Sequence, residues 1–523
     1  MIRLTFLLAL TSILSLQSFA QHSHEHGVCG TNEIDIERTK ANIAYAKSNP
    51  LQSRMTTYVP IRYNLIGEDD GTNAVSPNNV LDLMAAVNID FAPYDIQFFL
   101  EDGDGQPWDY TYNDDIFNDH ASFQPFLGNV RRNTTNAMTI FVPNTATPPG
   151  SSGLGVTLGY YAPGSGSQGR DYLVFKKSEV GSNASTASHE IGHYFSLPHT
   201  FRGWDCTSWQ GTTNEFYSNP VMETTAPCSS VPVELVSRGS DGNCATAGDL
   251  FCDTNADYNL GFGWSSCTYN GGVQDRTGTD LIPDENNFMG YFLDCNPYQF
   301  STEQVGAMTA DIASTNRAFL RGSLPTNTEE ITDPISNLIP VDGSTTPFGD
   351  QATLSWDAVP NAKYYFVELS DRRSMRASNL IYSNIGTSTS VVVDDLEPGS
   401  TYYYRVRAFS QSWFGEYGTV TEFTTGTASG TADQPQAVDA MLLYPNPAGV
   451  SLATTLKIVS QQGGDITLTV RDLTGRTLST RQEQLVSGDN LLSVTDLIPT
   501  VKGSYILSAN NAIGISSQKF DVL

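Results

Sequence analysis

The chain has 523 residues, which at about 100–200 residues per domain leaves room for several domains and makes a single compact fold unexpected. It carries 28 Lys and Arg against 56 Asp and Glu, a formal net charge of -28, and this sign disfavours nucleic-acid phosphates and anionic membrane surfaces as partners. Hydrophobic residues at 39%, with 24 Tyr and 25 Phe, are enough to build cores and exclude global disorder.

Residues 1–20 have the pattern of a secretory signal peptide. Arg3 precedes an apolar run over residues 4–16, and residues 18–20 (SFA) have the small-x-small form of a cleavage site. The alternative, a membrane anchor, needs about 18 or more apolar residues, and this run is shorter. No later stretch is long and apolar enough to span a bilayer, so we predict an exported, soluble product whose mature chain begins at Gln21.

Residues 21–54 are polar, with one short helical stretch, and are predicted to form a pro-segment. From residue 55 the pattern changes, because an amphipathic helix is predicted at 77–88 and strands at 56–66, 95–101 and 137–143. A helix is predicted at 184–195, and a last helix begins at Ser301, with a Ser301–Gln304 capping box and an end at Gly322 and Pro325. Strands interrupted by helices predict an α+β catalytic unit over residues 55–323.

The second half of the chain is predicted to be all β. Residues 324–334 are acidic, polar and contain proline, as an exposed linker does. A β-sandwich is then predicted over residues 335–427, from short strands at 352–356, 363–370, 390–396, 401–410 and 419–425. A second linker at 428–440 leads to a final β-rich block at 441–523.

The cysteines divide into a cluster and a remainder. In the oxidising compartment that export implies, six of the seven predict three disulfides whose connectivity the sequence leaves open: Cys206, Cys228, Cys244, Cys252, Cys267 and Cys295. Cys29 is left over. No Cys-x-x-Cys pair occurs, which argues against a zinc ribbon or a thioredoxin-like site.

The strongest chemical signal is the segment HEIGHYFSLPH, which contains His189, Glu190, His193 and His199. At 100° per residue, a helix projects His189 and His193 from one face, so both imidazoles can reach one ion. Pro198 forces the preceding residue out of helical geometry and lets the chain return His199 to the same ion. Three neutral imidazoles with an open fourth position predict a catalytic rather than a structural zinc site.

Glu190 is predicted to be the general base of this site. Zinc lowers the pKa of its bound water towards about 7, and a carboxylate next to the first ligand can accept the water proton and pass it to the leaving amine. The opposite helix face is predicted to be buried through Ala184, Ala187, Ile191 and Phe195. The alternatives are histidines of an ordinary helix or a structural metal site, and neither requires the glutamate or the long third spacing.

With GDLFCDT at 248–254 and NFMGYFLDC at 287–295, the chain resembles the metzincin zinc endopeptidases, most closely the pappalysins and their ulilysin-type bacterial relatives. The resemblance implies a metzincin-type zincin domain with a mixed twisted sheet and an active-site helix. It also implies that Met289 forms a Met-turn under the zinc and that Tyr291 stabilises the oxyanion. Without the resemblance, Met289 is an ordinary core methionine.

Two positions depart from the family pattern. Ser196 replaces a glycine where the helix breaks and positive φ is favoured, at a cost of about 1 kcal/mol unless the turn is made differently. Gly290 replaces an acidic residue. Neither change removes a ligand or the base.

The resemblance gives candidate roles to two further residues. In relatives with a cysteine switch, a pro-segment thiolate takes the open zinc position and keeps the enzyme latent, and Cys29 is the candidate here; the alternative is a free or intermolecularly paired thiol. In ulilysin-like relatives an acidic residue at the position of Asp294 selects Arg or Lys after the scissile bond. That preference implies self-cleavage between Ser53 and Arg54. The alternative for Asp294 is a solvated loop carboxylate.

The resemblance also implies structural calcium in the disulfide-rich part, with Asp249, Asp253 and Asp257 as hard oxygen ligands, and a disulfide between Cys267 and Cys295. The EDGDGQPWD stretch at residues 101–109 lacks the glutamate of an EF-hand loop, and we predict a turn there.

The first sandwich resembles a fibronectin type III domain, with Trp356 in an early core strand and Tyr402 at the position of a tyrosine corner. Its predicted role is a spacer, and the alternative is an adhesive module. The last block, which starts with YPNP at 444–447, resembles the C-terminal sorting domain of type IX secretion. It implies recognition by that machinery in a Gram-negative bacterium, passage through the periplasm, and release or attachment at the cell surface. The alternative is a small sandwich without a sorting role.

Together these patterns predict a secreted zinc endopeptidase, made as a zymogen, that hydrolyses protein or peptide substrates. The competing class is a cell-surface adhesin with a degenerate, inactive protease domain. Retention of all three histidines and Glu190 favours the enzyme.

Overall fold

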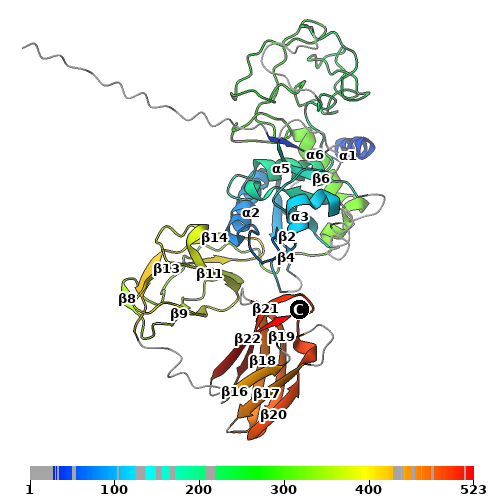
Figure 1. Ribbon diagram of the computed structural model, residues 1–523. Coiled ribbons are helices and arrows are strands. Elements are labelled where there is room, and N and C mark those ends of the chain that lie inside the picture. Colours follow the sequence, from blue (N-terminus) through cyan, green and yellow to red (C-terminus); the bar gives the residue numbers. More distant parts are fainter. Residues whose placement is uncertain are drawn as a thin grey trace, which may run out of the picture.

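The computed structural model describes residues 27–522 except for 30, 32–34, 50–54, 103–104, 124–126, 128–135, 149–155, 165–170, 207–217, 428–437, 439, 445, 447, 449–453, 461, 473–475 and 512–513. The predicted signal peptide and the Ser53–Arg54 cleavage site therefore lie outside the described residues. Figure 1 shows three parts: an α/β unit in the middle with an irregular region above it, and two all-β parts below.

The α/β unit is built on one mixed sheet of seven strands, in the order β1-β6-β7-β5-β2-β3, with β4 also paired to β2. The strands are β1 (Gly27–Cys29), β2 (Thr57–Gly67), β3 (Ile96–Leu100), β4 (Asp109–Tyr112), β5 (Met138–Val142), β6 (Val156–Ala162) and β7 (Tyr172–Phe175). β2 pairs in parallel with β3, β4 and β5, whereas β6 runs antiparallel to β7. Because β5 and β7 are buried at every position, they are covered on both faces, as in parallel sheets generally.

The predicted strands at 56–66, 95–101 and 137–143 correspond to β2, β3 and β5, whereas β6 and β7 were not predicted. The helices are α1 (Ile36–Ser48), α2 (Pro77–Phe91), α3 (Asp114–Asp119), α5 (Ser185–Tyr194) and α6 (Thr302–Ala313). The predicted Ser301–Gln304 capping box is present. The predicted end of this helix at Gly322 is wrong, since Ser314 adopts extended backbone and a 3-10 helix, η4 (Thr315–Arg321), follows it.

Three disulfides hold the irregular region between α5 and α6. They join Cys206 to Cys228, Cys244 to Cys252 and Cys267 to Cys295, and the last of these is the pairing that the family resemblance implied. The region has its own buried apolar cluster, which includes Trp204, Tyr258 and Phe292. Covalent links and this cluster take the place of regular secondary structure here.

The first all-β part contains β8 (Ser344–Thr345), β9 (Gln351–Ser355), β10 (Tyr364–Ser370), β11 (Leu380–Gly386), β12 (Ser390–Asp394), β13 (Thr401–Phe409), β14 (Phe414–Tyr417) and β15 (Thr421–Thr424). β12 and β9 form one sheet, and the other strands form the second. The hydroxyl of Tyr402 accepts a 2.9 Å hydrogen bond from the Glu397 backbone N–H, which is a tyrosine corner as predicted. Trp356 is buried directly after β9 and packs on Tyr365.

This sandwich packs on the α/β unit through buried polar contacts. Asp102 accepts hydrogen bonds of 2.6–2.7 Å from Lys363 Nζ, the Tyr364 hydroxyl and Gln411 Nε2. Arg407 of β13, which is 3% exposed, pairs with Asp82 of α2 at 2.5 Å. The two parts therefore share an interface. Asp102, which belongs to the predicted EDGDG turn, contributes its carboxylate to this interface.

The second all-β part contains β16 (Ala440–Tyr444), β17 (Thr455–Ser460), β18 (Gly464–Asp472), β19 (Thr477–Leu485), β20 (Gly488–Ser493), β21 (Gly503–Asn510) and β22 (Ile515–Val522). Sheets β16-β17-β20 and β19-β18-β21-β22 enclose a separate apolar cluster. The fold is thus α+β, with sandwich-like β parts at its carboxyl end. Among the residues that the structure describes, no helix has the length and hydropathy needed to cross a membrane.

Candidate metal centre

Helix α5 carries the histidine motif through the interior, and every residue from Ala187 to Tyr194 is buried. At Gly192, a Cβ atom would lie 2.4 Å from the sulfur of Met289, so only glycine permits this close approach. Met289, which is completely buried, therefore packs directly against the helix that carries the first two histidines. The role beneath a bound zinc that the family resemblance implied for Met289 stays a prediction.

The Nε2 atoms of His189, His193 and His199 lie 3.1–3.2 Å from one another. A triangle of this size leaves each nitrogen about 2 Å from a common point, which is the length of a zinc–imidazole bond. They are the one group of three His, Cys, Asp or Glu side chains among the described residues that meets the geometric requirements for holding a metal ion. The structure thus brings together the three predicted ligands.

The opposite nitrogen of each ring has a hydrogen-bond acceptor. His189 Nδ1 lies 2.6 Å from the Phe288 carbonyl oxygen, and His193 Nδ1 lies 2.7 Å from the Leu197 carbonyl oxygen. His199 Nδ1 lies 2.6 Å from Asp205 Oδ1. These acceptors assign the proton of each neutral ring to Nδ1, so three unprotonated Nε2 lone pairs face one another.

The environment keeps the rings of His189 and His193 neutral. Burial, and then the neighbouring imidazole of His199, lower the pKa of His189 to about 3. The same causes, in the same order, hold the pKa of His193 well below its usual value. Neutral imidazoles whose lone pairs converge repel one another unless a cation lies between them, so this donor set fits a divalent metal such as zinc.

The turn after α5 directs His199 back to the other two rings. Ser196 adopts the left-handed conformation with φ of 69°, which is the conformation that the family resemblance implied for this position. The Ser196 N–H donates to the His193 carbonyl and the Leu197 N–H to the Gly192 carbonyl, which ends the helix and reverses the chain. The departure from glycine is therefore accommodated with the turn intact.

Glu190 lies beside this centre, is 1% exposed, and is contacted by the amino-terminal segment. The hydroxyl of Thr31 donates a 3.0 Å hydrogen bond to Glu190 Oε2 and accepts one of 2.8 Å from the Tyr161 N–H of β6. Cys29 belongs to β1, which pairs in parallel with β6, and its backbone lies opposite Gly159. The thiol of Cys29 is outside the described side chains.

Two other predicted site residues differ in their surroundings. The ring of Tyr291 lies 5.9 Å from that of His189 and 5.2 Å from that of His199, centroid to centroid, so it borders the centre. Asp294 is exposed and follows Leu293 on the surface of the irregular region.

Asp205 is a site residue that sequence analysis missed. It is the one carboxylate among the three acceptors, and its other oxygen accepts the Gly203 N–H at 2.9 Å. The adjacent Cys206 ties the segment to Cys228. The signal that could have identified it is an aspartate six residues after the third histidine, next to a disulfide.

The predicted calcium ligands do not come together. Asp253 accepts the Ser301 hydroxyl and the Glu303 N–H at the start of α6, each at 2.7 Å. Asp257 accepts the Thr200 hydroxyl at 2.9 Å and the Leu260 N–H at 3.0 Å. Both carboxylates therefore already have structural partners, because they satisfy the donors of a helix start and a turn.

Asp249 instead lies close to Glu234, which the sequence did not indicate. A Cβ atom on Gly248 would lie 2.0 Å from Glu234 Oε2, and both carboxylates are at least 98% buried. Neither oxygen of Glu234 makes a well-formed hydrogen bond, although Arg238 Nη2 lies 3.0 Å from Oε1. Burial, and then the charge of Asp249, raise the pKa of Glu234 well above its usual range, and burial raises that of Asp249 to about 8.

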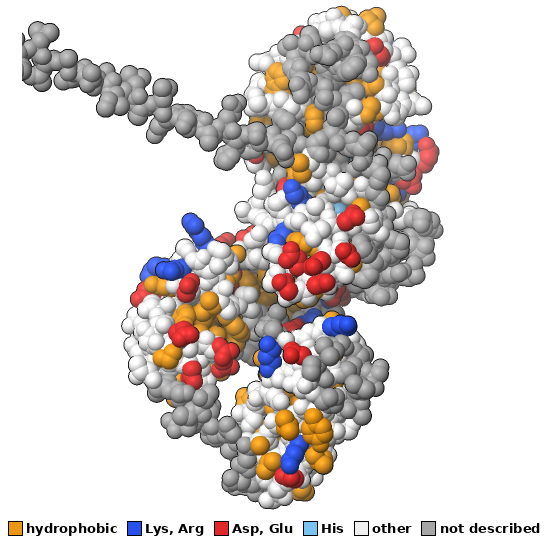
Figure 2. All heavy atoms as spheres, in the orientation of Figure 1, with side chains coloured by type: hydrophobic (Ala, Val, Ile, Leu, Met, Phe, Trp, Pro, Cys, Tyr) orange, Lys and Arg blue, Asp and Glu red, His pale blue; other side chains and the backbone are white. Residues whose placement is uncertain are grey.

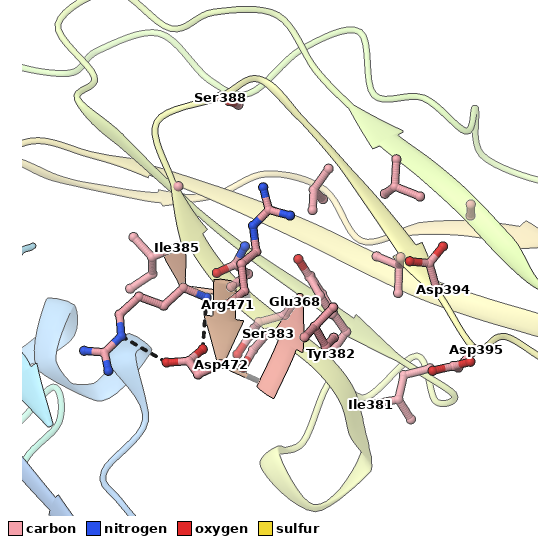
Figure 3. Close-up of a pocket in the computed structure, with 18 of the residues that line it drawn as sticks. Glu368, Ile381, Tyr382, Ser383, Ile385, Ser388, Asp394, Asp395, Arg471 and Asp472 are labelled. Atoms are coloured by element: carbon pink, nitrogen blue, oxygen red, sulfur yellow. Dashed lines mark hydrogen bonds and ion pairs between the residues drawn. The ribbon is translucent and has the colours of Figure 1, made fainter. Parts of the chain in front are cut away.

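A wide cavity of about 2220 Å³ lies away from the histidines, where the α/β unit and the two all-β parts meet. Glu368, Tyr382, Arg471 and Asp472 contribute to its walls, as Figure 3 shows. None of the three histidines lines it. Figure 2 shows acidic side chains gathered over the α/β unit, in keeping with the net charge.

Comparison with known proteins concerns the first all-β part. A family model described as "Fibronectin type III domain" matches residues 345–424. The sixth fibronectin type III domain of a human protein, fibronectin type III domain containing protein 3, is 21% identical, covering 21% of this chain and 92% of that chain, with a TM-score of 0.15. An Fn3-like protein from Clostridium thermocellum is 26% identical, covering 18% of this chain and 92% of that chain, with a TM-score of 0.14.

The fn3 domain of human contactin 1 is 16% identical, covering 21% of this chain and 90% of that chain, with a TM-score of 0.16. No curated protein matches the chain. The family match and the tyrosine corner formed by Tyr402 and Glu397 agree in position and type. Residues 345–424 of this chain form a fibronectin type III domain.

Proposed function

We propose that the chain is a zinc-dependent endopeptidase of the metzincin type, most similar to pappalysins, that is exported as a zymogen. The observation that carries the proposal is the convergence of three Nε2 atoms within 3.2 Å, each on a ring whose Nδ1 has an acceptor. When bound, zinc supplies a Lewis acid that polarises a carbonyl and acidifies water. His189, His193 and His199 are the residues that hold it.

Glu190 performs the proton transfers in this proposal. Its carboxylate takes a proton from the attacking water as the new C–O bond forms at the scissile carbonyl, and then gives it to the amine as the C–N bond breaks. Because Glu190 is 1% exposed, its charge interactions are screened less by water than they would be at the surface. Tyr291 borders the centre and stabilises the oxygen on which charge develops.

Strand β6 suits the binding of an extended substrate chain. It lies beyond β7 in the sheet, and its other partner is the short amino-terminal strand β1. Once that segment has left, main-chain groups such as the Tyr161 N–H become available to a peptide added as a further strand. In the described structure Thr31 uses that N–H and also Glu190, which supports latency of the uncut chain.

The test is a comparison of wild type, Glu190→Gln and the exposed control Glu329→Gln, each freed of its amino-terminal segment and assayed on casein and on peptides. Glu190→Gln is expected to lose about 10²–10⁴ in kcat while keeping one zinc ion, because only the general base is removed. The control and the wild type should be equally active, and a chelator should stop both. A freed wild type that holds zinc and cleaves no polypeptide would instead favour an adhesin with an inactive protease domain.

We further propose that calcium binds between Asp249 and Glu234, with Thr254 beside them. Asp249 accepts hydrogen bonds from the Phe251 N–H and the Thr254 hydroxyl, whereas the Glu234 oxygens face Arg238 without a well-formed hydrogen bond. Two buried carboxylates this close together are costly unless a cation neutralises them, and carboxylate and hydroxyl oxygens suit calcium. The Thr254 hydroxyl lies 2.9 Å from Asp249 Oδ2. This pair keeps Asp249 from the set that the family resemblance implied and leaves out Asp253 and Asp257, because those three aspartates do not form one metal-sized group among the described residues.

Export through the periplasm of a Gram-negative bacterium by type IX secretion completes the proposal. Residues 1–20 and the YPNP start of the last block support it, as does the separate apolar cluster of residues 438–522, which allows that block to be removed without opening another core. Mass spectrometry of protein from the culture medium and the cell surface tests it. Intact chains that still contain residues 441–523 at either place would contradict removal of the block.

A further inference from the structure

Helix α1 of the amino-terminal segment lies along α6, the helix that follows the irregular region (Figure 1). Thr39 and Asn42 of α1 are buried. At Gly306 of α6, a Cβ atom would lie 3.2 Å from the Cβ of Ala46, so the two helices approach closely at this point. The segment is therefore packed against the α/β unit and is not a free polar tail.

Asp311 of α6 is the main polar contact of α1. Its carboxylate, which is completely buried, accepts hydrogen bonds from two nitrogens of Arg38, one of them at 2.5 Å, and from Asn42 Nδ2 at 2.9 Å. Because Arg38 and Asn42 are four residues apart, they project from one face of the helix. A two-point contact with a planar guanidinium is specific for arginine, since lysine cannot reproduce it.

A second set of contacts connects α1 to the turn that directs His199. Thr39 Oγ1 donates to the Ser196 carbonyl oxygen at 2.8 Å, and Asn42 Nδ2 lies 2.8 Å from Ser196 Oγ. Ser196 is the residue in the left-handed conformation between the second and third histidines. Helix α1 thus binds the turn of the metal centre as well as α6.

The charges around Asp311 balance only while α1 is bound. Arg317, which is 1% exposed, contacts Asp311, Asp171 and the Tyr194 carbonyl oxygen. With Arg38, the cluster has two guanidinium groups and two carboxylates. Without Arg38 it keeps one guanidinium for two carboxylates, so Asp311 remains paired but the site regains an excess negative charge that attracts a cation.

We propose that the surface formed by Asp311, Ser196 and Gly306 is a binding site for helix α1 that keeps the pro-segment on the enzyme, and the enzyme inhibited, after the chain is cut between α1 and β2. The inference rests on the proposed function. Cleavage of the chain is then not enough to activate the enzyme. The cut segment keeps Thr31 on Glu190 until the Arg38–Asp311 contact is lost. The ligand is defined by its chemistry as a helix with arginine and asparagine four residues apart.

The experiment uses the full chain with a recognition sequence for a site-specific protease placed between residues 49 and 55. After cutting, native mass spectrometry and gel filtration measure how much segment stays bound. The wild-type segment should remain bound. Arg38→Ala should raise its dissociation constant at least about 30-fold, because one partner of a buried charge pair is removed. Lys40→Ala is the matched control, since the ion pair of Lys40 is with exposed Glu37, and this variant should change the constant less than about 3-fold.

A second variant, in α6, tests the same contact without changing the sequence of α1. Misfolding of α1 therefore does not explain its effect. Gly306→Leu should release the cut segment because the larger side chain occupies the space of Ala46, while the helix itself gains propensity. A wild-type segment that separates as soon as the chain is cut, or equal release from Arg38→Ala and Lys40→Ala, would overturn the inference. These readouts need no catalysis, so Arg38-dependent retention in a chain that cleaves no substrate would contradict the proposed function alone.

Discussion

The Thr31 hydroxyl lies between Glu190 and the Tyr161 N–H of β6, at 3.0 Å and 2.8 Å, and so joins a residue of the amino-terminal segment to the predicted general base. Thr31 and Glu190 are 159 positions apart in the chain. While this contact exists, the Glu190 oxygen that would accept a proton from water already accepts one from threonine. In the proposed zymogen, latency would therefore depend on at least one contact besides any made by the Cys29 thiol.

Thr31→Val should make the uncut chain partly active. The isosteric side chain keeps the volume but loses the hydroxyl, so a water can reach Glu190 more often, and we expect a several-fold rise in peptidase activity before any cleavage. The measurement is an initial rate on a fluorogenic peptide, with the chain confirmed uncut by mass spectrometry. Exposed Thr56→Val is the control, and equal rates for the two variants would contradict a role of Thr31 in latency.

Cys29→Ser tests the cysteine switch separately. If the thiolate occupies the open zinc position, the serine variant should activate earlier than wild type on incubation, because a hydroxyl is a much weaker zinc ligand. The time course of segment loss and of activity gives the result. If the onset of activity is unchanged, latency would depend on Thr31 and the α1 contacts and not on the Cys29 thiol.

Asp205→Ala should weaken zinc binding about 10–100-fold, because the carboxylate fixes the orientation and tautomer of the His199 ring. Asp205→Asn keeps an acceptor and should lose less. Competition with a chromophoric chelator measures the affinity, and the visible spectrum of the cobalt form reports the ligand geometry. Asp333→Asn in the linker is the control; an affinity in Asp205→Ala equal to that of the control would show that the contact does not orient the ligand.

Calcium should stabilise the chain most at neutral pH. Without calcium, the folded state holds protons on Glu234 and Asp249 more tightly than the unfolded state, so stability falls as pH rises from about 4, the usual carboxyl pKa, through about 8, the raised pKa of Asp249. Saturating calcium should remove this loss and raise Tm at pH 7.5 by mass action. Thermal scans with calcium and with a calcium chelator measure both effects.

Glu234→Gln should make Tm nearly independent of calcium, whereas Asp253→Asn should keep the calcium response and lose stability through the start of α6. The reverse result would restore Asp253 as a ligand. If wild type shows the pH effect and no calcium response, the carboxylate pair is a structural feature without a metal.

Asp102→Ala should destabilise the contact between the α/β unit and the fibronectin type III domain. It removes the acceptor of Lys363, Tyr364 and Gln411, and we expect a loss of about 2–3 kcal/mol in the free energy of unfolding, mostly from donors left without partners. Urea unfolding followed by tryptophan fluorescence measures it. Asp371→Ala, at an exposed site of the same domain, should be neutral; equal stabilities of the two variants would mean that the Asp102 contacts do not hold the domain on the α/β unit.

The spacing of His189, His193 and His199 predicted the convergence of these three rings from the sequence alone. In the same way Tyr402 predicted the tyrosine corner, and Ser301–Gln304 predicted the start of α6. These are local patterns, in which a few dihedral angles place side chains only a few residues apart. At Ser196 the positive φ that the family resemblance implied is present, although a serine side chain disfavours it.

Only the tertiary structure decided which distant groups meet. Thr31 reaches Glu190, Glu234 joins Asp249, and Arg38 finds Asp311, while Asp253 and Asp257, equally acidic in sequence, satisfy backbone and hydroxyl donors instead. No periodicity encodes such pairs, because each depends on how two separately formed elements are packed and on the need of every buried charge or donor for a partner. Local sequence patterns indicate which side chains can act as ligands, bases or caps. The packing of the elements determines which of these side chains come into contact.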